Sequence, residues 1–292
     1  METNRKKTLS TIVKIAISVF LLYFVFTKIK FADVWLVIQG VKWPFIVLSV
    51  LFFLGSQWVS AKRLLMFFRA SGFYLSAKSN YALYLVGMFY NFFIPGGIGG
   101  DAYKIYKLHK KFQWGVKSLS ASVFMDRFMG LTAIGVILIA MSFELLPKPW
   151  EALIIPLGLA LVIGGAYFFT RLSFPKFRGI FLPGLLSSLL VQLLQVGSVI
   201  CIIYSLDAPQ NIMSYILVFL VSSVLSIFSF AGIGVREFVF YEASKLLFID
   251  SSQAVTIGLL FSIITAFVSL FGIIYHFRTP ELTLEGKEEK QA

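Results

Sequence analysis

Apolar runs long enough to cross a lipid bilayer recur along nearly the whole chain. A membrane-spanning helix needs about 20 predominantly apolar residues. Only 14% of the 292 residues are charged and 58% are hydrophobic, whereas a soluble domain carries about a quarter charged residues. One globular core cannot bury this much apolar surface, so the sequence predicts an all-α polytopic integral membrane protein. The runs that meet the length requirement cover residues 9–27, 43–61, 119–142, 151–170, 180–205 and 253–277.

The net charge of +12 does not indicate a nucleic-acid-binding protein, because the cations stand in short segments between the apolar runs. Anionic lipid headgroups and the positive-inside rule explain cations in such places. Cys201 is the only cysteine and lies inside an apolar run, so it can form neither an internal disulfide nor a thiolate metal site. His109 and His276 have no second ligand nearby in the sequence. We therefore expect no metal and no other cofactor.

Two further apolar segments, residues 79–95 and 212–230, each end in a glycine-rich turn. The turns read Gly96-Gly97-Ile98-Gly99-Gly100-Asp101 and Ala231-Gly232-Ile233-Gly234-Val235-Arg236. Gly97 and Gly232 are 135 positions apart, and the flanking spans recur at nearly the same offset. This pattern indicates a duplication within one membrane domain, residues 1–277. The first repeat covers about 9–142 and the second about 151–277, and a polar tail over 278–292 follows.

Loop charges predict how the two interrupted segments sit in the membrane. Residues 62–78 and 104–117, on either side of the first one, are rich in lysine and arginine, and the positive-inside rule places both in the cytoplasm. The first interrupted segment must then enter and leave on one side. Each half contributes three full spans, so the second half is inverted and its segment dips in from the outer face. We predict about six full spans, two re-entrant broken helices and cytoplasmic termini; the alternative is eight ordinary spans with two glycine kinks.

The glycine turns are candidate binding elements. Non-helical backbone at membrane depth is tolerated only where protein or water satisfies its polar groups, so we expect both turns to line an internal cavity. Each turn opens a more polar helix, and Asp101 suits the N-cap position of the first. The free amides and positive dipole of a helix start attract anions, above all phosphate. No Gly-Lys-Ser/Thr follows either turn, which excludes an ATP-binding P-loop.

Charged residues within the apolar segments are the second indication of a binding site. Asp126-Arg127 lies early in the 119–142 span, and Arg236-Glu237 follows the second turn. Neighbouring helical residues point about 100° apart, so Asp126 and Arg127 are not expected to pair with each other. An arginine fork suits a phosphate; the plainer alternative is that each pair neutralises itself or lies near the interface. With polar residues that line the cavity or join helices, the candidate substrate-binding residues are Asn91, Pro95, Gly96, Gly97, Gly99, Gly100, Asp101, Lys104, Asp126, Arg127, Gln192, Gln195, Gly232, Gly234, Arg236 and Glu237.

Three motifs carry a family resemblance. The stretch Asn91-Phe92-Phe93-Ile94-Pro95-Gly96-Gly97-Ile98-Gly99-Gly100-Asp101, the pair Asp126-Arg127 and the stretch Gly232-Ile233-Gly234-Val235-Arg236-Glu237 resemble the membrane domain of lysylphosphatidylglycerol synthases. Over about residues 9–277 the chain is similar to the flippase-like family of stand-alone bacterial and archaeal membrane proteins. Phe230 departs from the family, which often has proline there. The resemblance implies movement of a lipid between the leaflets of the cytoplasmic (inner) membrane, without the lysine transfer of an aminoacyl-transferase domain.

These features predict a lipid flippase or transporter, and not an enzyme, that moves a phospholipid or a lipid-linked precursor. Its phosphate is expected to lie between the two glycine turns. Two alternatives stay open: a membrane enzyme acting on a polyprenyl (pyro)phosphate, although no nucleophile is obvious, and a non-transporting partner of a glycosyltransferase or synthase. The expected partners are the lipid substrate and the bilayer. The sequence leaves open whether the protein forms a homo-oligomer or binds a partner enzyme.

Overall fold

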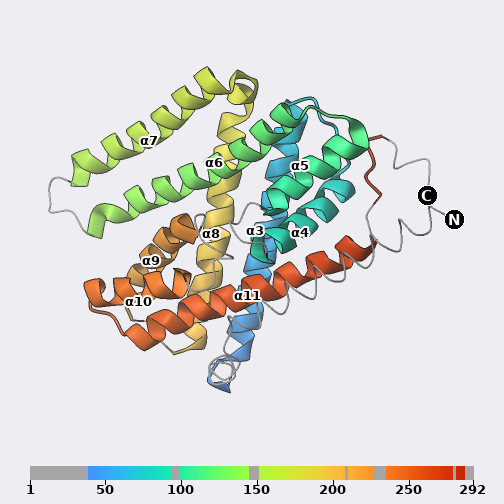
Figure 1. The fold of residues 1–292 in the computed structure, drawn as a ribbon. Helices are drawn as coiled ribbons and strands as arrows, with labels where there is room; N and C mark the ends of the chain where they lie inside the picture. The colour runs from blue at the N-terminus through green and yellow to red at the C-terminus, as the bar shows by residue number, and fades with distance from the viewer. Residues whose placement is uncertain are drawn as a thin grey trace.

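The computed structural model describes residues 39–93, 99–144, 151–207, 210–226, 235–278 and 281–286, and these form a helical bundle (Figure 1). The part described contains no strand, only one isolated β-bridge. The helices are α3 (Trp43–Ala70), α4 (Ala77–Phe93), α5 (Gly99–Phe112), α6 (Val116–Met141), α7 (Glu151–Ser173), α8 (Phe181–Ser205), α9 (Ile212–Leu225), α10 (Val235–Leu247) and α11 (Ser251–Arg278), with short 3-10 turns at Ser142–Glu144 and Pro175–Ile180.

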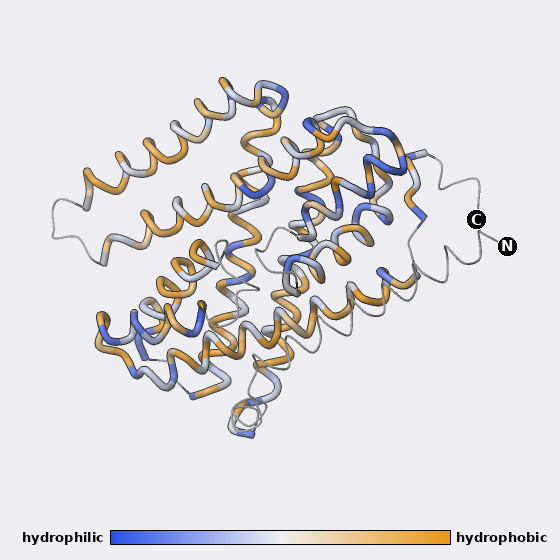
Figure 2. Tube along the Cα trace, viewed as in Figure 1, coloured by the Kyte–Doolittle hydropathy of each residue, from blue (hydrophilic) through white to orange (hydrophobic). Residues whose placement is uncertain are grey.

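Five of these helices are long and apolar enough to cross a membrane, namely α3, α6, α7, α8 and α11. They correspond to five of the six spans predicted from the sequence, and the run at 9–27 lies outside the described residues. Large apolar side chains are exposed on them, such as Leu157 and Leu161 on α7, as lipid-facing helices require. Figure 2 shows that hydrophobic residues recur along these helices. The protein is thus a multi-pass membrane protein. The prediction of a loop over 62–78 was wrong at its start, because α3 continues to Ala70.

Aromatic contacts identify one end of the bundle, which we call the basic end. The Phe73 ring, after α3, stacks on Trp114, before α6, with ring centroids 4.6 Å apart. Phe67 in the last turns of α3 meets Phe177, just before α8, at 5.5 Å. The connections that follow α3, α5 and α7 therefore lie together. The cations in these connections and in the helix turns that flank them include Arg69, Lys78, Lys110, Lys111, Lys117, Lys176 and Arg178.

Polar contacts identify the opposite end. The backbone N–H of Lys42, before α3, donates to the carbonyl of Ser205 at the end of α8 (2.9 Å), and the Lys42 side chain pairs with Asp207. The Tyr215 hydroxyl near the start of α9 lies 3.3 Å from Oε1 of Gln253 near the start of α11. The start of α9 and the connection from α10 to α11 are thus both at this end.

The shorter helices form two hairpins with opposite origins. The pair α4–α5 begins and ends at the basic end, whereas α9–α10 begins and ends at the opposite end. Each pair packs on itself and against α11, which runs past both (Figure 1). Both ends of each described hairpin thus lie at the same end of the bundle.

The centre of the bundle is the antiparallel pair α3 and α8. Ser49 on α3 lies 2.7 Å from Ser198 on α8, oxygen to oxygen, and small residues line this contact. Close packing through small residues and buried hydroxyls is how helices associate in lipid, where apolar surface alone gives no preference. Elsewhere Gly272 of α11 touches the backbone of α4, since an added Cβ would lie 2.2 Å from the Leu85 carbonyl oxygen. These contacts hold the hairpins against rigid spans.

A short segment after α11, residues 281–286, packs back on the basic end. Leu284 forms a β-bridge with Leu75, and the N–H of Ser76 donates to the Thr283 carbonyl at 3.0 Å. Leu282 is buried in the cluster formed by α3, α4, α5 and α6. This part of the tail, predicted only as polar, thus helps to fix the α3–α4 connection.

Substituting Leu282 with alanine is expected to lower the free energy of unfolding by about 2–3 kcal/mol, because the change leaves a cavity among well-packed side chains. Thermal unfolding of the purified protein in detergent measures the effect. Alanine at the exposed Leu246 serves as the matched control and should change stability by less than about 0.5 kcal/mol. Equal effects of the two substitutions would contradict the packed position of Leu282.

Candidate functional site

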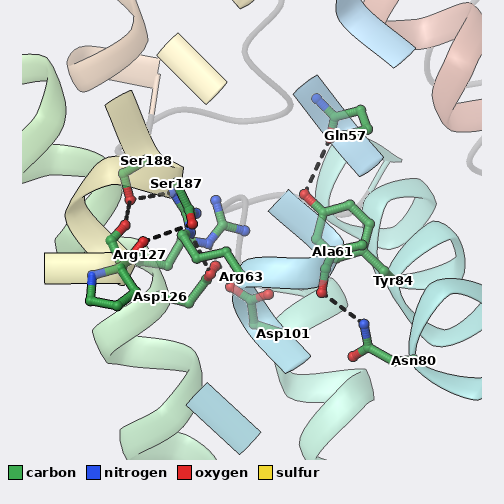
Figure 3. Close-up of polar contacts among 12 residues, drawn as sticks. Gln57, Ala61, Arg63, Asn80, Tyr84, Asp101, Asp126, Arg127, Ser187 and Ser188 are labelled. Carbon is green, nitrogen blue, oxygen red and sulfur yellow. Dashed lines mark hydrogen bonds and ion pairs between the residues drawn. The ribbon is translucent and has the colours of Figure 1, made fainter. Parts of the chain in front are cut away.

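Five charged side chains from three helices meet inside the first half of the bundle, and we call them the ion cluster: Arg63, Asp101, Lys104, Asp126 and Arg127. Figure 3 shows Arg63, Asp101, Asp126 and Arg127 of this cluster. On α5, Asp101 accepts from Lys104 Nζ at 2.8 Å and from Arg127 Nε at 3.0 Å. Asp126 accepts from Arg63 Nε at 2.7 Å. Asp126 and Arg127 therefore pair with different helices and not with each other, as their positions on one helix predict.

Burial differs sharply within the ion cluster. The side chains of Arg63 and Lys104 are 7% and 5% exposed, whereas that of Arg127 is 47% exposed. The cluster has three cations and two carboxylates, so it holds one positive charge more than it neutralises. Buried charges are costly unless they are paired. Arg127 combines a share in the excess charge with the most exposed side chain of the cluster, so it is the member best placed to meet an anion.

A close contact between α4 and α5 places Asp101 beside Arg127. An added Cβ on Gly100 would lie 1.7 Å from the Gly87 carbonyl oxygen, so only glycine permits this backbone approach. The Gly100 N–H donates to Oδ1 of Asn91 at 2.8 Å, which joins the end of α4 to the start of α5. Lys104 lies across Gly87, where an added Cβ would stand 2.2 Å from its Cε.

The predicted N-cap role of Asp101 is wrong. The helix α5 already includes Gly99, and Asp101 lies within its first turn. Its carboxylate accepts hydrogen bonds from the side chains of Lys104 on α5 and Arg127 on α6, and not from backbone amides at the start of the helix. The sequence left the role of Asn91 open. Its side-chain oxygen accepts a hydrogen bond from one of those amides, the Gly100 N–H, and so joins α4 to α5.

Arg236 occupies a separate place in the second half. It lies in the first turn of α10, is 9% exposed, and its guanidinium carbon lies 4.7 Å from the Phe261 ring centroid and 5.9 Å from that of Phe219. Its Nη1 is 3.4 Å from the Ser262 hydroxyl. No contact joins it to the ion cluster among the described residues. Glu237 follows it in the first turn of α10 and is half-buried.

The remaining predicted residues divide into two groups. Gln192 is buried on α8, and its Oε1 has no hydrogen-bond partner within the described ranges, while Gln195 is half-buried one turn later. The turn residues Pro95, Gly96, Gly97, Gly232 and Gly234 lie outside the described residues, so the predicted phosphate position between the turns stays a prediction.

Sequence reasoning missed several residues that the structure adds to the site. Arg63 was assigned to a loop, but it is buried on α3 and its Nη1 donates to the Ser188 hydroxyl of α8 at 2.7 Å. The Tyr84 ring on α4 lies 5.0 Å from Lys104 Nζ, measured to the ring centroid. The Tyr84 hydroxyl donates to Gln57 Oε1 (Figure 3). The apolar run that continues after Arg63 was the available signal that the helix extends through it.

Metal ligands do not gather in the described part of the chain, where no three His, Cys, Asp or Glu side chains meet. The arrangement can instead bind an anion by arginine forks, with carboxylates that orient the cations. Buried charge of this kind within membrane helices marks a pathway or a ligand site more often than a stabilising device.

Comparison with known proteins gives one match. Residues 11–183 match the lysylphosphatidylglycerol synthase TM region, which is more than half of the chain. The chain belongs to this family. The family match contains α3 to α7 and the whole ion cluster, and it ends in the first turn of α8, before Arg236. The resemblance predicted from the glycine motif is thereby confirmed. No curated protein and no solved structure matches the chain.

Proposed function

We propose that the protein is a lipid flippase or transporter of the cytoplasmic membrane, which moves a phosphate-bearing lipid between leaflets. The observation that carries the proposal is the ion cluster, with its single excess positive charge and half-exposed Arg127 inside a bundle of membrane helices. A lipid phosphate is the anion most available at that depth. Membership of the lysylphosphatidylglycerol synthase TM region family supports a lipid as the substrate.

The position of Arg127 along α6 supports this proposal. Arg127 stands 11 residues after Val116, the first residue of the 26-residue helix, which is roughly 16 Å along its axis at 1.5 Å per residue. That distance is about half of the 30 Å hydrocarbon core. A charged side chain at mid-depth is retained where it serves a pathway or a ligand.

Access from the bilayer is favoured by the face of α6 on which Arg127 lies. Phe124 and Leu131, three residues before it and four after it, share its face of the helix, and both are exposed. An arginine flanked by lipid-facing side chains can bind a phosphate while the acyl chains stay in the hydrocarbon region. This face of α6 offers the lipid a lateral route to the cluster.

The two hairpins support an inverted repeat as the transport framework. The starts of α3 and α8, α4 and α9, α5 and α10, and α6 and α11 are separated by 138, 135, 136 and 135 positions. Equivalent hairpins that enter from opposite ends are a recurring plan of transporters, in which the halves move against each other around a central site. By the positive-inside rule, we assign the basic end to the cytoplasm.

A liposome assay tests the proposal. The purified protein is reconstituted with short-chain fluorescent phosphatidylglycerol or a polyprenyl phosphate, and transbilayer movement is followed by reduction of the outer-leaflet dye. We expect protein-dependent movement of at least one of these lipids. Unchanged movement across the whole panel would reject translocation.

Replacing Arg127 with glutamine is expected to slow this movement about tenfold or more, since a hydrogen bond to a charged group contributes about 1.5–3 kcal/mol. The matched control is Arg69→Gln, which removes an exposed arginine that pairs with Glu285 at the basic end and should leave the rate within about twofold. Equal rates for Arg127→Gln and the unmodified protein would remove Arg127 from the pathway.

Ser188 gives some support to the alternative of a lipid-phosphate enzyme. It stands beside Arg63 like a nucleophile beside an anion-binding arginine, but it is fully buried and donates its own proton to the Gly184 carbonyl at 2.7 Å. We therefore favour translocation. Phosphate release from a polyprenyl pyrophosphate, abolished by Arg127→Gln, would favour the enzyme, and co-purification with one synthase without lipid movement would favour a partner role.

A further inference from the structure

Equivalent positions in the two halves of the bundle carry different charges. Adding 135 to the contact between Asp101 and Arg127 gives the contact between Arg236 and Ser262, and both contacts join the second helix of a hairpin to the following span. The first contact is an ion pair. The second contains a cation and a hydroxyl, so this contact lacks the acid that its counterpart has.

Two aromatic rings face Arg236, and one of them takes the place of an acid of the ion cluster. Phe261 stands at the position equivalent to Asp126, and Phe219 at the position equivalent to Tyr84, each 135 positions later. Both rings face the Arg236 guanidinium, at 4.7 and 5.9 Å. Such rings stabilise a cation and exclude water, but they accept no strong hydrogen bond from it.

Among the described residues, Arg236 has few hydrogen-bond partners. A guanidinium has five N–H donors; within the described part of the chain Nε has no acceptor, and Nη1 has only the Ser262 hydroxyl at 3.4 Å. No described carboxylate lies within ion-pair distance of its guanidinium. The carboxylate of the adjacent Glu237 still interacts with it electrostatically. The group is nine-tenths buried in the first turn of α10, whose free amides and dipole also attract an anion.

We propose that Arg236 and the first turn of α10 form a binding site for one phosphodiester monoanion, distinct from the ion cluster. One guanidinium fork matches two oxygens of one phosphate, and Phe219, Phe261 and Ser262 supply no second cation for a pyrophosphate. The site therefore selects phospholipids of the phosphatidyl class over polyprenyl pyrophosphates. This inference deepens the proposed function and rests on it for the lipid nature of the ligand.

Ser262→Asp tests the site by supplying the missing acid. The new carboxylate is expected to pair with Arg236, to raise the melting temperature and to weaken phosphate binding at least tenfold. Ser262→Asn has nearly the same shape without the charge, and it should keep the affinity within about threefold. Lys245→Gln, an exposed change on the same helix, should leave binding unaltered.

Binding is measured by native mass spectrometry of the full chain in detergent, with dioleoylphosphatidylglycerol, the phosphate-free dioleoylglycerol and farnesyl pyrophosphate as competing probes. We expect a phosphatidylglycerol adduct that Arg236→Gln removes and that neither other probe displaces. A separate melting experiment with inorganic phosphate distinguishes a free anion from a lipid: stabilisation by phosphate alone, without a lipid adduct, would overturn the lipid assignment.

The outcomes separate this inference from the proposed function. Equal phosphatidylglycerol affinities of Ser262→Asp and Ser262→Asn overturn the inference, even where the liposome assay shows lipid movement. An adduct that depends on Arg236, without any movement in liposomes, keeps the site and rejects translocation. If Ser262→Asp does not yield folded protein, Arg236→Lys and Arg236→Gln replace it as the test. Lysine keeps the positive charge but lacks the two-pronged guanidinium, and glutamine lacks both. Unchanged phosphatidylglycerol binding in both variants would reject the site.

Discussion

Replacing Asp126 with alanine is expected to lower the free energy of unfolding by about 3–5 kcal/mol, because it leaves the Arg63 charge buried without its acid. The Arg63 side chain is 7% exposed and donates from Nε to Asp126 at 2.7 Å. Through Nη1 it also reaches Ser188, so the same guanidinium joins α3, α6 and α8. Titration of the purified protein with a denaturing detergent, followed by circular dichroism, measures the loss.

Two controls identify the cause of this loss. The double variant Arg63→Met/Asp126→Leu removes both charges and is expected to recover most of the stability, since apolar residues of similar volume replace a buried pair well. Arg69→Ala breaks the exposed pair with Glu285 and should cost less than about 1 kcal/mol. A double variant no more stable than Asp126→Ala would mean that packing around Asp126, and not the stranded charge, sets the cost.

Hydropathy and loop charge predicted most of the bundle. The five described long spans follow from apolar runs because lipid leaves a helix few other solutions. The hairpin α4–α5 followed from the basic residues of 62–78 and 104–117, and the stacking of Phe73 on Trp114 places the flanking connections together. Periodicity alone could not distinguish this hairpin from two spans. The loop charges favour the hairpin, because they constrain sides of the membrane and not helix lengths.

The site was predicted less completely than the fold. Asp101, Asp126 and Arg127 stood out because charge inside an apolar segment is rare. Arg63 did not, because a cation beside Lys62 at the end of an apolar run is usual at a membrane surface, and its burial depends on the three-dimensional position of Asp126. The N-cap prediction for Asp101 was wrong for a related reason. Its carboxylate forms ion pairs with Lys104 and Arg127, and these are stronger than a hydrogen bond from a backbone amide.

The predicted repeat rests on sequence motifs that gave the two halves equal weight. The two glycine turns lie 135 positions apart, like the helices around them. The residues that distinguish an internally neutralised cluster from a single buried guanidinium are nevertheless ordinary ones, Phe261 and Ser262. A phenylalanine and a serine in a membrane helix predict nothing individually. Only their contact with Arg236 gives them meaning, and that contact depends on the packing of α10 against α11.

Replacing Gly100 with alanine is expected to abolish lipid movement and to destabilise the protein by about 1–3 kcal/mol, because the added methyl overlaps the α4 backbone. Its Cβ would lie 1.7 Å from the Gly87 carbonyl oxygen, and backbone cannot turn aside as a side chain can. The hairpin must open, which carries Asp101 away from Arg127 and breaks the bond from the Gly100 N–H to Asn91.

Two further glycine substitutions make this prediction specific to the hairpin. At Gly87 an added Cβ meets the flexible Lys104 side chain, so Gly87→Ala should displace Lys104 and slow lipid movement at a smaller cost in stability. At Gly164, within α7, no atom lies within 4 Å of an added Cβ, and alanine there should raise stability by about 0.5–1 kcal/mol through its better helix propensity. Lipid movement in liposomes and melting temperature are measured for all three variants. Wild-type movement by Gly100→Ala would show that the ion cluster does not depend on the close approach of α4 and α5, because the hairpin cannot keep its contact at Gly87 once the methyl is present.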